Sequence, residues 1–486
     1  MRRVYWVCGG IALILVQALR CPAQTVPTYR ATTRLVEVSV IATDKNGPVG
    51  DLTKDDFVLY DNGKKQNIAF FEEFSRQALR EAATTAPTKL APGEFSNRSA
   101  QSLAEQGGGA VVIVFDALNT GFTDQAIAKK AIMKTLEAVH AGDHVGIYLL
   151  GSMMSVIQDF TSDSEQLRHV VETYAAWPDI SYVPPQRRVE LTQTAVWQIR
   201  SHLAHLPCRK SVIWIGAGLP NGLYGADFNV YIVDPRGIAG FPELRAEHTS
   251  MAELVPFSWG PALFAREKEI AASTGGVAFT YSNDIRGAIE QAISDGDLTY
   301  TVGFYVPALE EHDAMEYMRK ASLREGSLFH KLRVEITRPG VTARYRQSYA
   351  VAPYQAPLER RVGDAFLSPV DLTELSISAR LARGTSTLKL PLTIGATDLG
   401  LETKGDSRSG AVDAIIIERD LKGVELSRTE RALAFDIDEQ KYDAFLKAGL
   451  RVTFDLSPQP TLAEVKVVVF DRTSGRIGSL TIPVQR

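Results

Sequence analysis

Three oxygen-bearing side chains, Asp116, Asn119 and Thr120, follow directly on an apolar run in the stretch VIVFDALNTGF, residues 112–122. A carboxylate, an amide and a hydroxyl are ligands that hard cations such as Mg²⁺ take in proteins. Short polar residues also end strands, because their side chains accept hydrogen bonds from nearby main-chain N–H groups. The residue types therefore leave two hypotheses open: a cation site, or a strand end capped by Asp116.

Two further groups of residues could bind a ligand. His202, His205 and Cys208 recur at three-residue spacing, and residues three apart on a helix can clasp Zn²⁺, although the third turns away unless the helix ends first. For Arg236, in the segment DPRG, the two hypotheses are contact with an anionic ligand and a position in a turn. In both cases we favour the structural alternative, a helix end and a turn. Neither Gly-x-Ser-x-Gly nor His-Glu-x-x-His occurs, so we predict that the protein is not an enzyme.

The elements that must position Asp116 lie in residues 109–306. AVVIVF and SVIWIGAG are continuous apolar runs, as in strands buried on both faces of a sheet. Apolar residues at helical spacing predict helices over about 124–139, 187–206 and 262–274, and LTYTVGFYV is predicted as the last strand. This alternation predicts an open, Rossmann-type α/β sandwich with Asp116 at the end of its first strand.

The regions on either side are predicted to be β-rich. Residues 33–75 alternate apolar and polar side chains around Asn-Gly turns and predict a small antiparallel β unit, whereas residues 76–108 predict a flexible linker. A hairpin over 325–350 is expected to pack with the N-terminal β unit, because both are too short to be stable alone. Residues 357–486 have alternating runs and no long helical pattern, and predict an Ig-like β-sandwich.

The first residues have the layout of a secretory signal peptide. Arg2 and Arg3 precede an apolar stretch, and small residues follow up to Ala23, so we predict a signal peptide over 1–23, with an uncleaved anchor as the alternative. Cleavage would leave 50 Lys and Arg against 57 Asp and Glu and move the net charge from −4 to −7. Without a basic stripe, nucleic acid is excluded as an expected partner. We predict a periplasmic or secreted protein with no transmembrane segment after cleavage.

The order of the motifs resembles a von Willebrand factor A-type (VWA) domain. FDALNT, IQDFTSD, RKSVIWIGAGLP, YIVDPRG and TYTVGFYVP follow one another as in such domains. With the preceding VEVSVIATDKNGPVGDLTKDDFVLYDNGKKQNI, they are similar, more narrowly, to the exported VWFA-related family of acidobacteria. The resemblance covers roughly residues 33–350. It implies a VWA-like α/β sandwich, flanked by the β units, whose binding site lies where the strands end.

The resemblance also implies a metal site, from which this sequence departs. The family motif is Asp-x-Ser-x-Ser, with a Thr from a later loop and an Asp after the fourth strand. Asp116 matches the first Asp and Thr120 the second hydroxyl, whereas Leu118 stands in place of the first Ser, and Asn119 offers a substitute oxygen. The later Thr would be Thr192 or Thr194, the later Asp is replaced by Ala217, and the same binding edge would include Asp234 and Arg236.

The resemblance thus implies a degenerate site for Mg²⁺ or another divalent cation, with no other cofactor. It implies an exported, non-enzymatic protein that binds a protein or cell-envelope partner along the edge where the strands of the α/β sheet end. The alternatives are a structural scaffold whose β-sandwiches make the contacts and, third, an uncatalogued enzyme.

Overall fold

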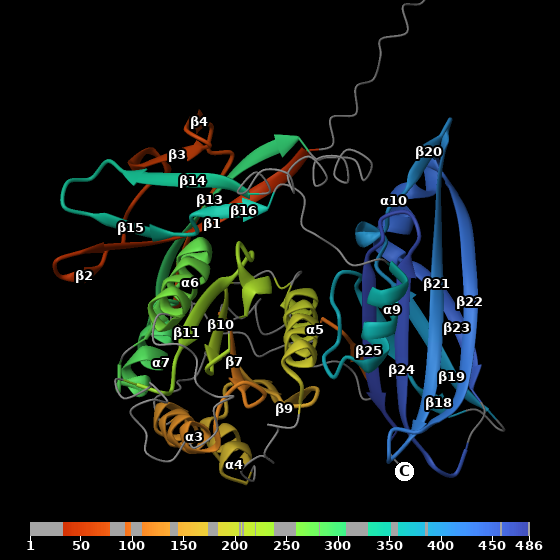
Figure 1. The fold of residues 1–486 in the computed structure, drawn as a ribbon. Coiled ribbons are helices and arrows are strands. Elements are labelled where there is room, and N and C mark those ends of the chain that lie inside the picture. The colour runs from red at the N-terminus through yellow and green to blue at the C-terminus, as the bar shows by residue number, and fades with distance from the viewer. Residues whose placement is uncertain are drawn as a thin grey trace, which may run out of the picture.

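The computed structural model describes residues 33–77, 93–98, 109–136, 144–173, 183–203, 206, 209–218, 220–237, 259–280, 282–307, 329–350, 358–383, 387–456 and 459–484. These residues form an α/β unit, an N-terminal β-rich unit above it and a C-terminal β-rich unit to its right (Figure 1). The fold is therefore of the predicted class, α/β plus β. The predicted signal peptide, residues 1–23, lies outside the described residues.

A six-stranded sheet with the strand order β12-β11-β10-β7-β8-β9 forms the α/β unit. All neighbouring strands are parallel except β9, which runs antiparallel to β8. Every residue of β7, β8 and β11 is buried, which accounts for their unbroken apolar sequences. The strands are β7 (Ala110–Asp116), β8 (His144–Leu150), β9 (Met154–Thr161), β10 (Lys210–Ile215), β11 (Asn229–Val233) and β12 (Ala278–Phe279).

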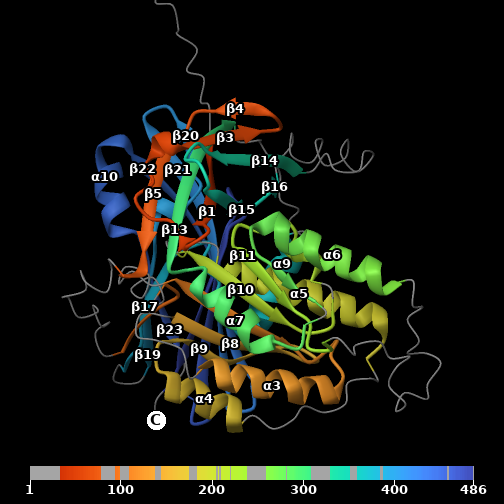
Figure 2. The ribbon, with the colours of Figure 1, turned by 90° about the vertical axis from the view of Figure 1, so that its left-hand side faces the viewer.

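Helices cover both faces of this sheet (Figure 2). One face packs against α3 (Phe122–Leu136), α4 (Ser164–Thr173) and α7 (Ile285–Ser294). The other packs against α5 (Pro185–Leu203) and α6 (Trp259–Thr274). Because each helix returns the chain to start the next parallel strand, α3 and α5 begin at the edge where the parallel strands end. We call this edge, at which β7 ends in Asp116, the strand-end edge.

The N-terminal β unit consists of two sheets that share one apolar core. The first has the order β15-β1-β13-β5 with β2 beside β1, and the second has the order β16-β14-β3-β4. Its strands are β1 (Thr33–Asp44), β2 (Gly47–Pro48), β3 (Phe57–Asp61), β4 (Lys64–Gln66), β5 (Phe70–Ser75), β13 (Leu298–Pro307), β14 (Phe329–Ile336), β15 (Thr342–Tyr345) and β16 (Ser348–Ala350). The hairpin β14–β15 thus joins the N-terminal strands, β14 beside β3 and β15 beside β1.

One strand lies in a different sheet from the one predicted. The sequence predicts LTYTVGFYV as the last strand of the α/β sheet, but β13 pairs antiparallel with β1 and β5. Its alternate residues Tyr300, Val302 and Phe304 are buried in the core of the N-terminal β unit. This period of two is typical of an antiparallel strand with one buried face. The α/β unit therefore ends before residue 298 and is inserted between strands of the N-terminal β unit.

The C-terminal β unit also consists of two sheets around one core. The first contains β6 (Glu94–Ser96), β17 (Ile377–Arg380), β18 (Ala382–Arg383), β19 (Leu388–Ile394) and β23 (Leu450–Leu456). The second contains β20 (Glu402–Lys404), β21 (Ser407–Asp420), β22 (Glu425–Asp438), β24 (Leu462–Asp471) and β25 (Ile477–Pro483). Two ten-residue helices that the sequence analysis missed accompany the sheets, α9 (Leu358–Leu367) and α10 (Glu439–Ala448).

Part of the predicted linker 76–108 is a strand of this C-terminal unit. β6 pairs antiparallel with β17, and Phe95 packs against the core of the unit. The buried Asn97 side chain donates to the main-chain oxygens of Leu372 and Leu375, at 2.7 Å each, and accepts from the Ile377 N–H at 2.8 Å. Residues 93–98 are therefore held by partners about 280 positions away, which a local pattern cannot reveal.

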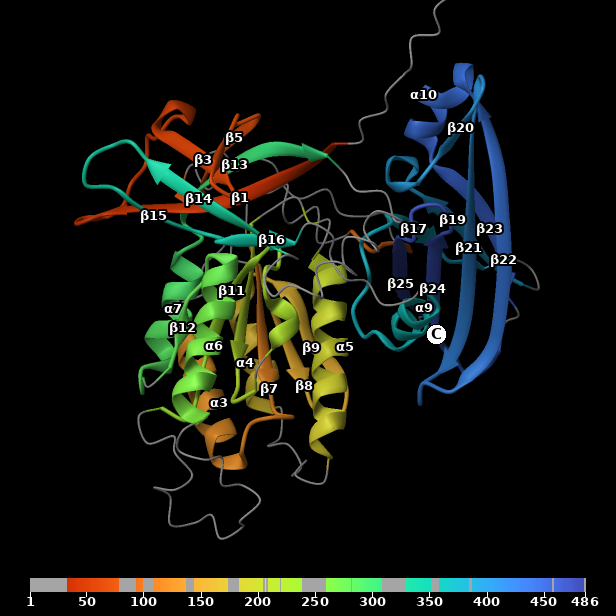
Figure 3. The same ribbon diagram turned by 45° about the horizontal axis from the view of Figure 1, so that its top comes forward.

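Both β units contact the α/β unit away from the strand-end edge. Figure 3 shows the N-terminal β unit lying across one end of the α/β unit. Arg344 of β15 pairs with Asp295 and donates to the Gly275 carbonyl at 3.0 Å, and these two residues follow the last residues of α7 and α6. The C-terminal unit bonds to the end of α5, where the Thr373 N–H donates to the Ser201 carbonyl at 3.1 Å. In the described part of the chain, no helix is long and apolar enough to cross a membrane.

Candidate functional site

Asp116 lies at the centre of the strand-end edge and is fully buried. Its strand, β7, is hydrogen-bonded to β10 on one side and β8 on the other. After Asp116 the chain turns into α3, and the Leu118 N–H donates to the Leu150 carbonyl at 2.8 Å. The Leu118 side chain is buried in the apolar core and provides no hydroxyl group beside Asp116.

The Asp116 carboxylate is bonded by N–H donors of the protein itself. Asn119 donates to it through its main-chain N–H, at 3.0 Å, and through its side-chain amide, at 3.0 and 2.9 Å from the two oxygens. The Trp214 indole donates at 3.3 Å. Burial raises the pKa of Asp116 from 3.8 to about 6, and the bonds from Asn119 and Trp214 counteract the rise.

The two hydroxyl groups predicted for this site extend the same network. Thr120 Oγ1 accepts a hydrogen bond from the Ala217 N–H at 3.1 Å, and the Asn119 amide lies 3.3 Å from Thr192 Oγ1. Thr194 is two positions further along α5, and residues two apart on a helix do not face the same neighbour. Of the two threonines considered, Thr192 is therefore the one that reaches the loop after β7.

Two glycines that the sequence analysis did not single out bring the next loop over Asp116. A Cβ atom at Gly216 would lie 2.6 Å from the Asp116 Cβ, and one at Gly218 would lie 2.7 Å from Asp116 Oδ2 and 2.7 Å from the Asn119 Cβ. Only a residue without a side chain allows this approach. The segment GAG after β10 therefore covers the carboxylate closely. The signal that could have revealed it is the pair of glycines around Ala217.

The arrangement does not fit a bound cation. A hard cation requires several oxygen ligands, and the Asp116 oxygens face the amide and indole N–H groups of Asn119 and Trp214. Leu118 contributes no oxygen, and the main chain at Gly218 lies against the carboxylate. Within the described ranges, no three His, Cys, Asp or Glu side chains gather closely enough to hold a metal ion. Asp116, Asn119 and Thr120 are brought together, but as a hydrogen-bonded network.

Asp234 and Arg236 form a separate pair at the end of β11. The guanidinium of Arg236 donates to both Asp234 oxygens, Nε to Oδ1 at 2.8 Å and Nη2 to Oδ2 at 2.7 Å. The Arg236 N–H also donates to Asp234 Oδ1 at 3.0 Å, and Gly237 has a φ of +66°, so DPRG is a turn. Because Arg236 folds back onto Asp234, its charge is neutralised within the protein.

Glu267 of α6 is a buried acid that the sequence analysis missed. It is fully buried, and neither carboxyl oxygen has a hydrogen-bond partner among the residues that the structure describes. Burial raises the pKa of Glu267 from 4.5 to about 8, and the negative charge of Asp234 adds to the rise, whereas Arg236 opposes it. The side chain is therefore mostly protonated at neutral pH. Glu267 lies in a helix of ordinary composition, so no sequence signal distinguishes it.

Two of the three residues considered for Zn²⁺, His205 and Cys208, lie outside the described residues. His202 is buried at the end of α5, with Nδ1 2.6 Å from the main-chain oxygen of Asp371. Its ring stacks on Phe160, with the ring centroids 5.7 Å apart. His202 therefore joins the α/β unit to the C-terminal β unit.

No protein-family description and no curated protein sequence matches the chain. Similar solved structures include an aerotolerance-related membrane protein from Bacteroides fragilis, at 17% identity over 38% of this chain and 99% of that one, with a TM-score of 0.28. BatB from Bacteroides thetaiotaomicron has 19% identity over 38% and 98% of the two chains, with a TM-score of 0.28. The manganese-loaded TRAP protein of Plasmodium vivax has 12% identity over 45% and 83%, with a TM-score of 0.25. Similarities this distant do not identify a site or a partner.

Proposed function

We propose that this chain is an exported, non-enzymatic VWA-type protein that binds a protein or cell-envelope partner through the strand-end edge, without a metal ion. The observation that carries the proposal is the orientation of this edge. In the described structure, the N-terminal β unit is bonded to the residues that follow α6 and α7, and the C-terminal unit to the end of α5. All of these points lie at the opposite edge of the α/β sheet. The fold therefore presents the strand-end edge away from both β units.

Exposed apolar side chains at this edge support the proposal. Phe122, the first residue of α3, is 63% exposed, and Val189, in the first turns of α5, is 56% exposed. Phe122 is three residues after Asn119, and Val189 is three residues before Thr192. The two exposed side chains therefore flank the contact between Asn119 and Thr192. Large aromatic and aliphatic side chains at the centre of an interface contribute much of the binding energy. The buried polar network of Asp116, Asn119 and Thr120 holds the loop that leads into Phe122 and α3.

The internal bonding of the polar residues also favours binding over catalysis. A catalytic acid or base must reach the proton that it transfers, and a metal-bridged contact requires an open coordination position. The Asp116 carboxylate is covered and bonded by Asn119 and Trp214. Arg236 is bonded to Asp234 in the same way. These polar groups therefore stabilise the edge, and we assign recognition to the surface above them.

One observation favours a second candidate function, a scaffold whose C-terminal β unit makes the contacts. Leu367 at the end of α9 is 74% exposed, and Leu421 and Val424 in the β21–β22 turn are 79% and 56% exposed. They belong to one region of the unit, because Arg419 beside this turn donates to the Phe366 carbonyl at 2.7 Å. Exposed apolar groups of this kind mark interaction sites.

Site-specific photo-crosslinking in producing cells separates the two functions. A photoreactive residue is placed at Phe122, at Val189, at Leu421 or, as a control, at the exposed Lys268 of α6. We expect a crosslinked product of defined mass from positions 122 and 189 only. A product from 421 with none from 122 or 189 would show the C-terminal unit to be the contact surface and would contradict the proposal.

A further inference from the structure

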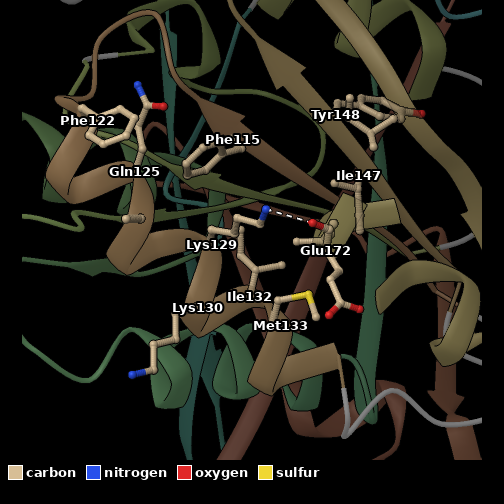
Figure 4. A pocket seen from close by; sticks show the side chains of 13 residues that line it. Phe115, Phe122, Gln125, Lys129, Lys130, Ile132, Met133, Ile147, Tyr148 and Glu172 are labelled. Carbon is tan, nitrogen blue, oxygen red and sulfur yellow. Dashed lines mark hydrogen bonds between the residues drawn. The ribbon is translucent and has the colours of Figure 1, made fainter. Parts of the chain in front are cut away.

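A cavity of about 420 Å³ lies between α3, α4 and the sheet of the α/β unit (Figure 4). Its walls include apolar side chains from three strands and two helices, namely Phe115, Ile132, Met133, Ile147, Ile157 and Val171. An apolar cavity of about 150 Å³ holds one benzene ring, so this cavity has room for roughly two or three rings.

One flank of α3 forms the rim of the cavity and leaves it open to solvent. Phe122, Ala126, Lys129 and Met133 line the cavity and recur every three or four residues, so they lie on the same side of the helix. Phe122 and Ala126 are exposed. Because the Ala126 side chain is a single methyl group, it leaves a way in from solvent at this point of the rim.

The charged groups of the lining do not favour a charged ligand. Lys129 donates from Nζ to the main-chain oxygen of Glu172 at 3.1 Å, and so bridges α3 and α4. The Glu172 side chain belongs to the same lining and brings a carboxylate into it, whereas the Lys130 side chain points away in Figure 4. An ion of either sign would leave water for apolar walls and meet a group of its own sign. An uncharged ligand avoids both costs.

The lining also favours rings over alkyl chains. In Figure 4 the rings of Phe115 and Phe122 lie on one side of the lining, and the sulfur of Met133 lies on the other. Aromatic rings pack against one another in offset or edge-to-face contacts, which add to the energy of apolar burial. A methionine sulfur makes favourable contacts with the edge of a ring.

We infer that this cavity binds an uncharged aromatic molecule of roughly two or three fused rings, which enters past Ala126 and lies between α3, α4 and the sheet. The volume lies within the usual range of ligand pockets. The inference does not depend on the proposed function, although Phe122 takes part in both. Ligand binding to the purified protein tests it without any partner, so the failure of one leaves the other standing.

The first experiment is a calorimetric titration of the purified full chain with three ligands that share one skeleton. These are 2-naphthol, 2-naphthoate and 2-naphthylmethylammonium, which at pH 7 are uncharged, anionic and cationic. We expect 2-naphthol to bind at least tenfold more tightly than either ion, and at least tenfold more tightly than phenol, which fills less of the cavity. Absence of 2-naphthol binding, or binding of either ion as tight as that of 2-naphthol, overturns the inference.

Variants on the exposed flank of α3 locate the ligand without disturbing the core. Ala126→Trp should close the cavity and abolish 2-naphthol binding, whereas Ala126→Ser should bind it as the wild type does. Lys134→Trp adds the same side chain at an exposed position of α3 outside the lining and should also keep binding. Binding of 2-naphthol that survives Ala126→Trp with unchanged affinity would place the ligand elsewhere and overturn the inference.

Discussion

At the scale of single residues, the Asp116 network determines how this protein should respond to metal ions. A ligand present at about 100 times its dissociation constant adds about 2.7 kcal/mol to stability, which a thermal-unfolding experiment detects. We expect the thermal-unfolding midpoint to be the same with Mg²⁺, Mn²⁺ or Ca²⁺ as with EDTA, because the Asp116 oxygens face N–H donors. A midpoint shift that disappears in Asp116→Ala would contradict this prediction and restore the cation hypothesis.

The same residue makes a prediction about stability. Asp116→Ala removes the acceptor of two Asn119 N–H groups and of the buried Trp214 indole. Leaving buried donors unsatisfied should lower the free energy of unfolding by roughly 2–4 kcal/mol. Chemical denaturation measures the loss, with Asp443→Ala, an exposed change in α10, as the comparison. A loss below about 1 kcal/mol would show that the network contributes little to stability.

Glu267 should make stability depend on pH. Its pKa is about 8 in the folded protein and 4.5 ordinarily, so the folded state keeps the proton between these values. Its contribution to stability is complete below pH 4.5 and is lost as the pH rises through 8. Between pH 5 and 9 the wild type should lose on the order of 3 kcal/mol relative to Glu267→Gln. The free energy of unfolding, measured across this pH range, checks the sign of the pH dependence. Glu269→Gln, on the exposed side of α6, is the control. Parallel pH profiles of the wild type and Glu267→Gln would contradict the prediction.

At the scale of elements, the glycines of the loop after β10 allow this loop to lie close to Asp116. Gly216→Ala places a Cβ atom 2.6 Å from the Asp116 Cβ, so the loop must shift, at a cost of roughly 1–3 kcal/mol. A Cβ at Gly363 of α9 meets no atom within 4 Å, and Gly363→Ala should stabilise the protein by about 0.5–1 kcal/mol, because Ala favours helices. Unfolding of the two variants should therefore differ in sign, and equal effects would rule out the close approach at Gly216.

Some of the elements could be predicted from the sequence, and others could not. The strands β7 and β10 and the helices α5 and α6 follow from apolar runs and helical spacing, which are local signals. β13 was placed in the wrong sheet because its partner β1 begins about 265 residues earlier, and β6 was missed because a three-residue strand carries almost no pattern. The burial of Glu267 and the close approach of Gly216 and Gly218 to Asp116 are tertiary features. The candidate edge was thus predictable, but its internal bonding was not.

At the scale of the whole molecule, the α/β unit and the C-terminal β unit should unfold together. Glu374 joins them, because it accepts from Ser201 of α5 at 3.3 Å, from the Ile477 N–H at 2.9 Å and from Arg361 of α9 at 2.8 Å. Arg361 is almost fully buried, so Glu374→Ala leaves its charge without this carboxylate.

Breaking a buried pair in this way costs roughly 3–5 kcal/mol. Because Arg361 and Ile477 belong to the C-terminal β unit, most of the loss should fall on that unit, and the lost bond from Ser201 weakens its contact with the α/β unit. We expect the unfolding of Glu374→Ala, followed by calorimetry, to separate into two transitions where the wild type shows one. Glu359→Ala, an exposed change on the same helix α9, should keep the single transition. If Glu374→Ala also unfolds in one step at a lower temperature, other contacts couple the units. The carboxylate would then stabilise only the C-terminal β unit.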